Sequence, residues 1–272
     1  MKILAISIPT FNRCEYLLGL LASIEKNTNE INRNLFRVYI YDNNSDDATG
    51  DIKNNYSYEI AYSKNSTNIG GLKNIHKAYS TPDEPYIWVI GDDELLPANS
   101  IDNVLSIIIR DKPGLIINRI YSHKLLVPVH GYFPSFAAFA SYAAYSNPYL
   151  LIYHSYISAN IIRKDCYDLE FHNFIHGDLY DWLYCIANSL IKNNSAIHFM
   201  QEVTLIVRNE RAPPSELENS QRYQFHLDTC DSQVKYLNWL KEKIPLMNFD
   251  ATNTVPNYEH LCIAANNNLI IE

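Results

Sequence analysis

The stretch YIWVIGDDELLP, Tyr86 to Pro97, is the most informative part of this 272-residue chain for its fold class. Its first half is β-branched, aromatic and apolar, which is typical of a strand buried on both faces. Three adjacent carboxylates follow at once: Asp92, Asp93 and Glu94. Neighbouring carboxylates repel one another, so a fold keeps such a cluster where a cation lies among them or where water solvates them. An exposed acidic turn that caps the next helix is the alternative interpretation.

The same alternation of apolar strands and amphipathic helices continues on both sides of this stretch. We expect strands at residues 3–8, 36–42, 58–63, 86–91 and 114–121. Helices are expected at residues 15–27, 70–80 and 98–110. Strands and helices in series imply a parallel sheet with right-handed crossovers, so the predicted fold class is α/β.

The part of the chain beyond residue 121 has a weaker pattern. We expect strands at residues 156–165 and 202–210 and helices at residues 179–193 and 222–243. Residues 135–147 form an apolar helical pattern that places Phe136, Phe139, Ala140 and Ala143 on one face. Packing in the core is the first interpretation of that face, and contact with an acceptor's lipid or the membrane surface is the second.

Composition excludes several classes of function. With 22 basic and 30 acidic residues the net charge is −8, and basic residues cluster in pairs at most, which argues against a nucleic-acid-binding surface. A phosphate-bearing ligand would therefore need a metal ion or backbone amides. The 5 cysteines are scattered without a CxxC spacing, which indicates a reducing, cytoplasmic compartment. The apolar segment 131–158 is interrupted by prolines and is too short to cross a bilayer.

Polar clusters follow the first four expected strands, where ligands bind in open parallel sheets. Four motifs carry a resemblance to a known family: SIPTFNRCEYLLGLLASI (7–24), VYIYDNNSDDAT (38–49), NIGGLKNIHKA (68–78) and IWVIGDDELLPANSIDNVL (87–105). In this order and spacing they resemble the family 2 glycosyltransferases with the GT-A fold, over residues 3 to 120. The fourth motif is similar to the branch that includes abequosyltransferases and other O-antigen and capsule enzymes.

The resemblance implies a nucleotide site at the strand ends. The loop after the first strand would cradle base and ribose, Asp42 would meet the pyrimidine edge with Asn44 nearby, and a glycine turn would let the backbone approach the ligand. The implied nucleotide-binding residues are Pro9, Thr10, Arg13, Asp42, Asn44, Asn68, Gly70 and Asp92. Arg208 and Arg211, in a loop after an expected strand, are candidates to close on the diphosphate, with solvated arginines as the alternative.

The resemblance also implies a divalent cation, Mn²⁺ or Mg²⁺, because such ions take carboxylate and phosphate oxygens as ligands. Asp93 would be the main ligand and Glu94 an additional or supporting one. The family's Asp-x-Asp-Asp pattern has Gly91 at its first position here.

Transfer with inversion needs a base that deprotonates the acceptor hydroxyl. By position in the family pattern, Asp178 is the first candidate and Asp181 the second, while an aspartate that only caps the next helix is an equal alternative. His176 is expected on the acceptor side. The histidine pair His172 and His176 has a spacing that could hold zinc, but Gly177 follows and no glutamate lies between them, so we do not favour that interpretation.

The resulting hypothesis is a metal-dependent inverting glycosyltransferase with a UDP, CDP or dTDP sugar as donor. The acceptor would be a saccharide or lipid-linked saccharide of a surface polysaccharide, and the protein would be cytoplasmic, at or near the inner face of the plasma membrane. Residues 1–215 would form the GT-A domain, with a nucleotide-binding half (1–120) and an acceptor-binding half (121–215), followed by a helical extension (216–272). A non-catalytic nucleotide-sugar-binding subunit of a glycan assembly complex is the alternative.

Overall fold

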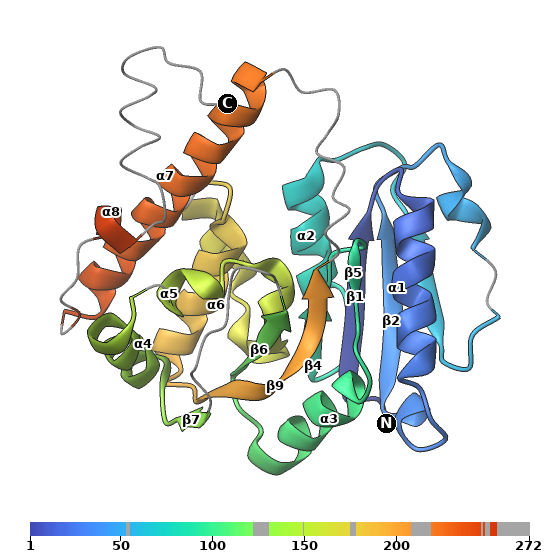
Figure 1. Ribbon diagram of the computed structural model, residues 1–272, viewed down its shortest axis with the longest axis horizontal. Coiled ribbons are helices and arrows are strands. Elements are labelled where there is room, and N and C mark those ends of the chain that lie inside the picture. Colours follow the sequence, from blue (N-terminus) through green and yellow to red (C-terminus); the bar gives the residue numbers. More distant parts are fainter. Residues whose placement is uncertain are drawn as a thin grey trace.

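A computed structural model describes residues 1–52, 55–121, 131–148, 150–174, 178–207, 219–245, 247 and 251–254. In these residues one mixed sheet of nine strands, in the order β3-β2-β1-β4-β8-β6-β9-β5 with β7 paired to β9, runs through the molecule. Helices α1 and α7 lie at opposite sides of the molecule (Figure 1). Arg208, Arg211 and His176 lie outside the described residues.

The amino-terminal half confirms the predicted alternation. Its parallel strands are β1 (Leu4–Thr10), β2 (Phe36–Asp42), β3 (Ile60–Lys64) and β4 (Tyr86–Val89). Its helices are α1 (Cys14–Lys26), α2 (Gly71–Ser80) and α3 (Ser100–Asp111). Strand β4 ends two residues earlier than expected, so Asp92 and Asp93 lie in the turn after it and Glu94 begins the next strand.

The carboxyl-terminal half interrupts the parallel order. Its strands are β5 (Glu94–Leu95), β6 (Leu115–Tyr121), β7 (Gly131–Phe133), β8 (Asn160–Arg163) and β9 (Ile197–Val207). Strand β8 lies between β4 and β6 and is antiparallel to both, so β6 and its parallel partner β9 run in the same direction as β4. The strand expected at 156–165 is shortened because residues 157–159 form a 3₁₀ turn.

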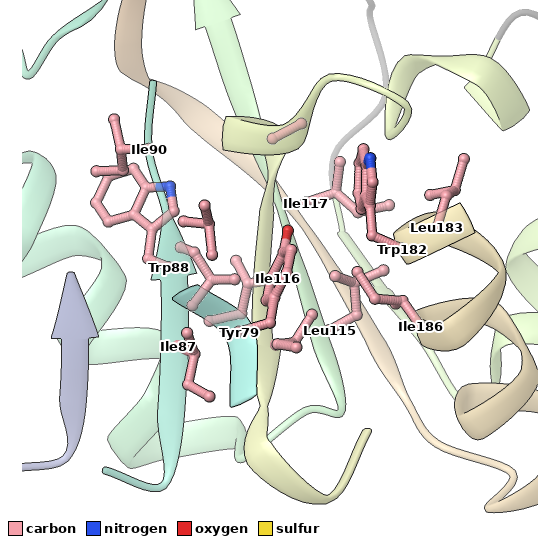
Figure 2. Packing of buried hydrophobic residues seen from close by; sticks show 14 of the residues in the cluster. Tyr79, Ile87, Trp88, Ile90, Leu115, Ile116, Ile117, Trp182, Leu183 and Ile186 are labelled. Atoms are coloured by element: carbon pink, nitrogen blue, oxygen red, sulfur yellow. The ribbon is translucent and has the colours of Figure 1, made fainter. Parts of the chain in front are cut away.

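The remaining helices are α4 (Phe136–Ser146), α5 (Leu150–Tyr153), α6 (Asp181–Lys192), α7 (Asn219–Lys243) and α8 (Ala251–Thr254). Figure 2 shows side chains of β4, β6 and α6 packed in one apolar cluster with Tyr79 of α2. The ring of Tyr79 stacks on Trp182 of α6 at 6.0 Å between centroids. This contact joins the two halves of the molecule through one core.

The face of α4 that carries Phe136 and Phe139 packs in the core, as the first interpretation expects. Phe136 and Phe139 are both 0% exposed, and the Phe139 ring contacts Phe133 and Phe199. These side chains cannot reach a membrane or a lipid while α4 is folded, because the core already covers them. No helix among the described residues has both the length and the hydrophobicity that crossing a membrane requires.

Candidate active site

A pocket of about 270 Å³ opens at the carboxyl ends of β1 and β4. Five of its lining residues, Pro9, Thr10, Arg13, Asp92 and Asp93, are among those that the resemblance implies for the site. The lining consists of Pro9, Thr10, Phe11, Arg13, Asn43, Gly71, Asn74, Ile75, Gly91, Asp92, Asp93 and Ile157. The acidic motif therefore faces a crevice, as the resemblance implies, and the exposed-turn alternative is wrong because Asp92 and Asp93 are only 3% and 7% exposed.

Arg13 holds the two aspartates of this pocket together. Its Nη1 lies 2.9 Å from Asp92 Oδ1, and its Nη2 donates to Asp93 Oδ2 at 3.1 Å. The other Asp92 oxygen accepts the hydroxyl hydrogen of Thr10 at 2.7 Å. We expected a cation among the carboxylates, and in the structure the guanidinium of Arg13 lies there. Arg13 therefore lies in the predicted pocket, where it pairs with the acidic motif.

Gly91 lets the Asp93 carboxylate pack against the backbone. A Cβ atom at Gly91 would lie 3.0 Å from Asp93 Oδ1 and 3.6 Å from the Glu94 carboxyl carbon. The side chains of Asp93 and Glu94 therefore cover Gly91, which stands at the first position of the acidic motif. Glu94 is 5% exposed and begins β5, which pairs with β9.

Asn43 is a site residue that the sequence argument missed. It lines the pocket, and its amide donates to Asn68 Oδ1 at 2.8 Å. Its carbonyl oxygen accepts from the Ile69 backbone at 2.9 Å and from Asn65 at 3.0 Å. Asn68 in turn accepts from the Gly70 amide at 2.8 Å, and Gly70 has a φ of +87°, which favours glycine. Asn68 and Gly70 therefore shape the loop before α2, while Asn43 contacts the pocket.

Asp42 and Asn44 flank Asn43 but are not part of the pocket lining. Asp42 is fully buried: one carboxylate oxygen accepts from the Ser45 backbone at 2.8 Å, and the other accepts from the Tyr62 hydroxyl. Burial and this hydrogen bond raise the pKa of Tyr62 above its usual value. Asn44 has a φ of 72°, a turn conformation that asparagine tolerates. The strand-end signal at 42–44 located the right loop, and only the structure identifies Asn43 as its pocket residue.

The two candidate bases have different surroundings. Asp178 is 7% exposed, accepts from the Tyr180 backbone at 2.9 Å, and is 3.4 Å from the Tyr184 hydroxyl. The first contact closes a turn before α6, whose N-cap residue is Tyr180 and which has no side-chain capping hydrogen bond. Asp181 is 1% exposed and lies between His76 and His172. Neither aspartate is part of the pocket lining.

The donor atoms at the pocket fit a hard divalent cation. Asp92 and Asp93 contribute carboxylate oxygens to the lining, the ligand type that Mg²⁺ and Mn²⁺ select, and Glu94 follows them at the start of β5. The Arg13 side chain is 39% exposed, so its guanidinium can exchange a carboxylate partner without unpacking the core. A cation and Arg13 would share the same two aspartates.

Comparisons with known proteins agree with this geometry. The model of the family Glycosyl transferase family 2 matches residues 5–131. Abequosyltransferase RfbV of Salmonella typhimurium is 36% identical over 103 residues, which are 36% of this chain. The aligned segment spans only 30% of that relative's length.

Solved structures of low sequence identity have a similar fold. S. aureus TarS 1-349 in complex with UDP-GlcNAc has a TM-score of 0.59 at 14% identity, over 99% of this chain and 93% of that chain. Mannosyltransferase PcManGT from Pyrobaculum calidifontis, in complex with GDP-Man and Mn²⁺, has a TM-score of 0.56 at 12% identity, over 97% of this chain and 75% of that chain. Residues 5–131 are therefore similar to glycosyltransferase family 2, and the chain has the GT-A fold of these structures.

Proposed function

We propose that this protein transfers a sugar from a nucleoside diphosphate donor to a saccharide acceptor during O-antigen-type surface polysaccharide synthesis. The observation that carries the proposal is the pair of buried aspartates, Asp92 and Asp93, in the wall of a pocket at the carboxyl end of β4. The match to family 2 and the abequosyltransferase relative support the reaction class.

The donor would lie between β1 and α2, where the pocket is lined by backbone and amide groups as well as by carboxylates. Asn43, held by Asn68 and Ile69, is rigid enough to orient a base or ribose through hydrogen bonds. Similar structures bind UDP, UDP-GlcNAc or GDP-Man, which supports a nucleotide-sugar donor. A UDP, CDP or dTDP sugar remains our prediction for this chain.

Charge is the central problem of the reaction, because the departing diphosphate is an anion and the pocket wall is acidic. Mn²⁺ or Mg²⁺ held by Asp93, with Glu94 and Asp92 in support, would neutralise the leaving group when bound. Arg13 is placed to add a second positive charge, because its guanidinium already lies against both aspartates. Guanidinium groups match phosphate geometry, so Arg13 can contact the diphosphate directly.

Inversion of the anomeric centre would need a base on the acceptor side, and we keep Asp178 as the first candidate. Its contact with Tyr184 is long, at 3.4 Å, so one carboxylate oxygen is weakly held and can accept a hydroxyl proton. Asp181 is the second candidate, and its two histidine contacts at 2.9 and 2.6 Å make it less available.

The bridge between Arg13 and the two aspartates favours a second candidate function. A protein whose acidic motif is already compensated by arginine could bind a nucleotide sugar without transferring it, as a subunit of a glycan assembly complex.

A cytoplasmic location near the membrane face is part of the proposal and rests on the sequence argument.

The test is transfer and donor hydrolysis by the purified protein with Mn²⁺, measured as nucleoside diphosphate release with UDP, CDP and dTDP sugars. We expect slow release without acceptor and faster release with a polysaccharide repeat as acceptor. The matched control is Asp83→Ala, because that side chain is 99% exposed and lies at the other end of β4. Binding without release for every donor would support the non-catalytic subunit and refute the enzyme.

For the base, the two aspartates are compared directly. Asp178→Asn should abolish transfer and leave donor binding intact, because the substitution keeps the shape of the side chain and removes its basicity. Loss of transfer in Asp181→Asn alone, with active Asp178→Asn, would show that the base is misassigned.

A further inference from the structure

A second cluster of metal-ligating side chains lies outside the pocket. It is formed by His76 of α2, His172 of the 3₁₀ segment Leu169–Phe174 and Asp181, the first residue of α6. The side chains of His76 and Asp181 are 7% and 1% exposed, while that of His172 is 31% exposed. Three elements that are far apart in sequence thus meet at the buried carboxylate of Asp181, and the cluster is open to solvent on the side of His172.

The donor atoms of this cluster are already close to a coordination geometry. His76 Nε2 lies 2.9 Å from Asp181 Oδ1, and His172 Nδ1 lies 2.6 Å from Asp181 Oδ2. Ligand atoms of all three residues lie within 4.8 Å of one another. A tetrahedral ion with bonds of about 2.1 Å needs donors about 3.4 Å apart, so the two short contacts would have to lengthen by several tenths of an ångström to admit one.

His76 also has the outer contact that orients a metal-binding imidazole. Its second nitrogen, Nδ1, is hydrogen-bonded to the hydroxyl of Tyr167. A tyrosine hydroxyl oxygen can accept the Nδ1 hydrogen. A histidine held in that way directs the Nε2 lone pair at an ion, and such supporting contacts are common around metal ligands. The ring of Tyr167 is itself fixed by stacking on Tyr79 at 4.8 Å.

We propose that His76, His172 and Asp181 bind one transition-metal ion of the Zn²⁺ class, with water in the fourth position. Imidazole suits zinc and cobalt, whereas the all-carboxylate set at the pocket suits magnesium and manganese. The chain thus has two sites of different metal selectivity. This site would tie α2 to α6, and α2 carries Gly71 and Asn74, which line the pocket. The ion would therefore fix the position of a pocket wall.

The experiment uses the full chain, stripped with a chelator and titrated with Co²⁺ alone. Tetrahedral Co²⁺ with nitrogen ligands absorbs visible light strongly, whereas Co²⁺ in an octahedral all-oxygen site absorbs weakly. We expect the strong absorption to saturate at one equivalent and to disappear when Zn²⁺ displaces Co²⁺. Mg²⁺ in excess should leave it unchanged, which separates this site from the carboxylates of the pocket.

His172→Gln is the informative variant, because this side chain is the most exposed of the three and its loss is the least harmful to folding. We expect at least a tenfold weaker Co²⁺ affinity. His198→Gln is the matched control, since His198 Nδ1 also lies against a carboxylate, 2.9 Å from Asp111, but lacks a second imidazole. Asp93→Ala is the second control and should keep the strong absorption whether or not it transfers sugar.

An absent or weak absorption in the wild type would overturn the proposal and leave the cluster as an ion pair between helices. The same conclusion would follow from undiminished affinity in a folded His172→Gln, or from equal loss in His198→Gln. Should His172→Gln fail to fold, zinc-edge X-ray absorption of the wild type decides: two imidazole nitrogens and a carboxylate oxygen around one Zn²⁺ are expected, and an all-oxygen shell would contradict them.

Discussion

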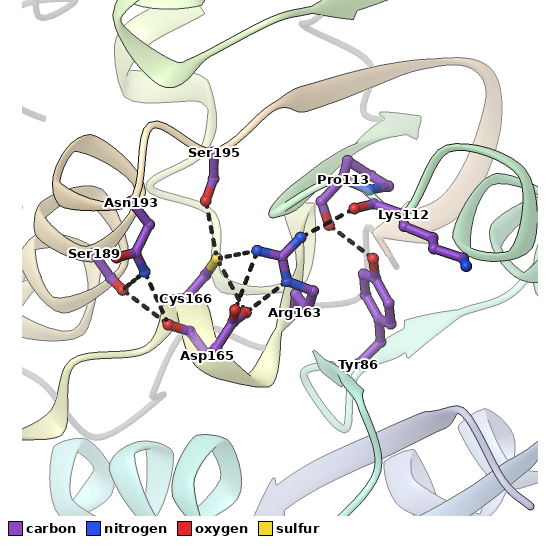
Figure 3. Close-up of polar contacts among 9 residues, drawn as sticks. All are labelled: Tyr86, Lys112, Pro113, Arg163, Asp165, Cys166, Ser189, Asn193 and Ser195. Carbon is purple, nitrogen blue, oxygen red and sulfur yellow. Dashed lines mark hydrogen bonds and ion pairs between the residues drawn. The ribbon is translucent and has the colours of Figure 1, made fainter.

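An arginine paired with aspartate lies near each end of β4, and the surroundings of the two pairs differ. At the amino end, Arg163 pairs with Asp165 at 2.6 Å, and the carboxylate is 61% exposed (Figure 3). At the carboxyl end, Arg13 pairs with Asp92 and Asp93, whose side chains are 4% and 9% exposed in the wall of a pocket. One network lies at the surface, and the other keeps its carboxylates out of water beside an open space.

The polar groups of the network at the amino end of β4 find their hydrogen-bond partners within the protein. Arg163 also donates to the Lys112 carbonyl at 3.1 Å, the Tyr86 hydroxyl donates to the Pro113 carbonyl at 2.8 Å, and Cys166 contacts Ser195 (Figure 3). Burial raises the pKa of Tyr86 to about 12, so its hydroxyl remains a donor at neutral pH.

Buried carboxylates are costly unless a cation compensates them, so a fold that places two at a pocket is prepared for a charged ligand. The comparison predicts that changes at the amino end affect stability and changes at the carboxyl end affect activity.

The largest effect is expected for Asp93→Ala. Loss of the main carboxylate ligand should reduce transfer about 100-fold or more, which corresponds to about 2.7 kcal/mol of transition-state stabilisation. The unfolding midpoint in urea should stay close to that of the wild type, because the substitution also relieves repulsion with Asp92. Steady-state donor turnover measures the first quantity. Unchanged turnover in a folded variant would refute the metal assignment.

Gly114→Ala should disrupt the packing at the amino end of β4 and lower the stability of the protein. The added Cβ would lie 2.5 Å from Ser195 Cβ and 3.0 Å from Cys166 Sγ, so packed side chains must move. We expect a loss of about 1–3 kcal/mol in the free energy of unfolding, with turnover per folded molecule unchanged. Chemical denaturation and active-site titration give the two values. A variant as stable as the wild type would contradict the tight packing at this end.

Gly91→Ala is the matched substitution at the other end. Its Cβ would lie 3.0 Å from Asp93 Oδ1, which belongs to a side chain rather than to the backbone. The displaced carboxylate should lower turnover about tenfold, about 1.4 kcal/mol, while stability changes less than in Gly114→Ala. A larger loss of stability in Gly91→Ala than in Gly114→Ala would contradict the claim that the amino end governs stability and the carboxyl end governs activity.

Tyr86→Phe should have the smallest effect. It removes one buried hydrogen bond to the Pro113 carbonyl and should cost about 0.5–1.5 kcal/mol of stability. Turnover should not change, because Tyr86 lies at the end of β4 away from the pocket. A clear fall in turnover without a fall in stability would mean that the amino end communicates with the site.

The sequence was sufficient for the amino-terminal half because its signals are local. Buried strands, amphipathic helices and strand-end polar clusters repeat there in order, and parallel strands bring their carboxyl ends to one edge. The acidic motif and the loop of Arg13 were thus expected at that edge, and both line the pocket there. The choice of Asn43 over Asn44 was not predictable, because it depends on a left-handed turn at Asn44 and on contacts with Asn65 and Asn68.

The carboxyl-terminal half depends on long-range contacts that a pattern does not encode. Residues 156–165 read as one strand, yet a 3₁₀ turn takes residues 157–159, and β8 runs antiparallel between β4 and β6. The structure places His172 beside His76, 96 residues earlier by their numbers, with 4.2 Å between the ring centroids. No periodicity in the sequence links those two positions.

The most direct test of the central claim is calorimetric titration of UDP, CDP and dTDP into the wild type, with and without Mn²⁺. The account predicts that at least one of these nucleotides binds tightly, that removal of Mn²⁺ weakens its binding at least tenfold, and that Asp93→Ala abolishes this difference while Asp83→Ala keeps it. Equal affinity with and without Mn²⁺, unaffected by Asp93→Ala, would contradict the claim that the carboxylates after β4 hold the cation that binds the donor's diphosphate.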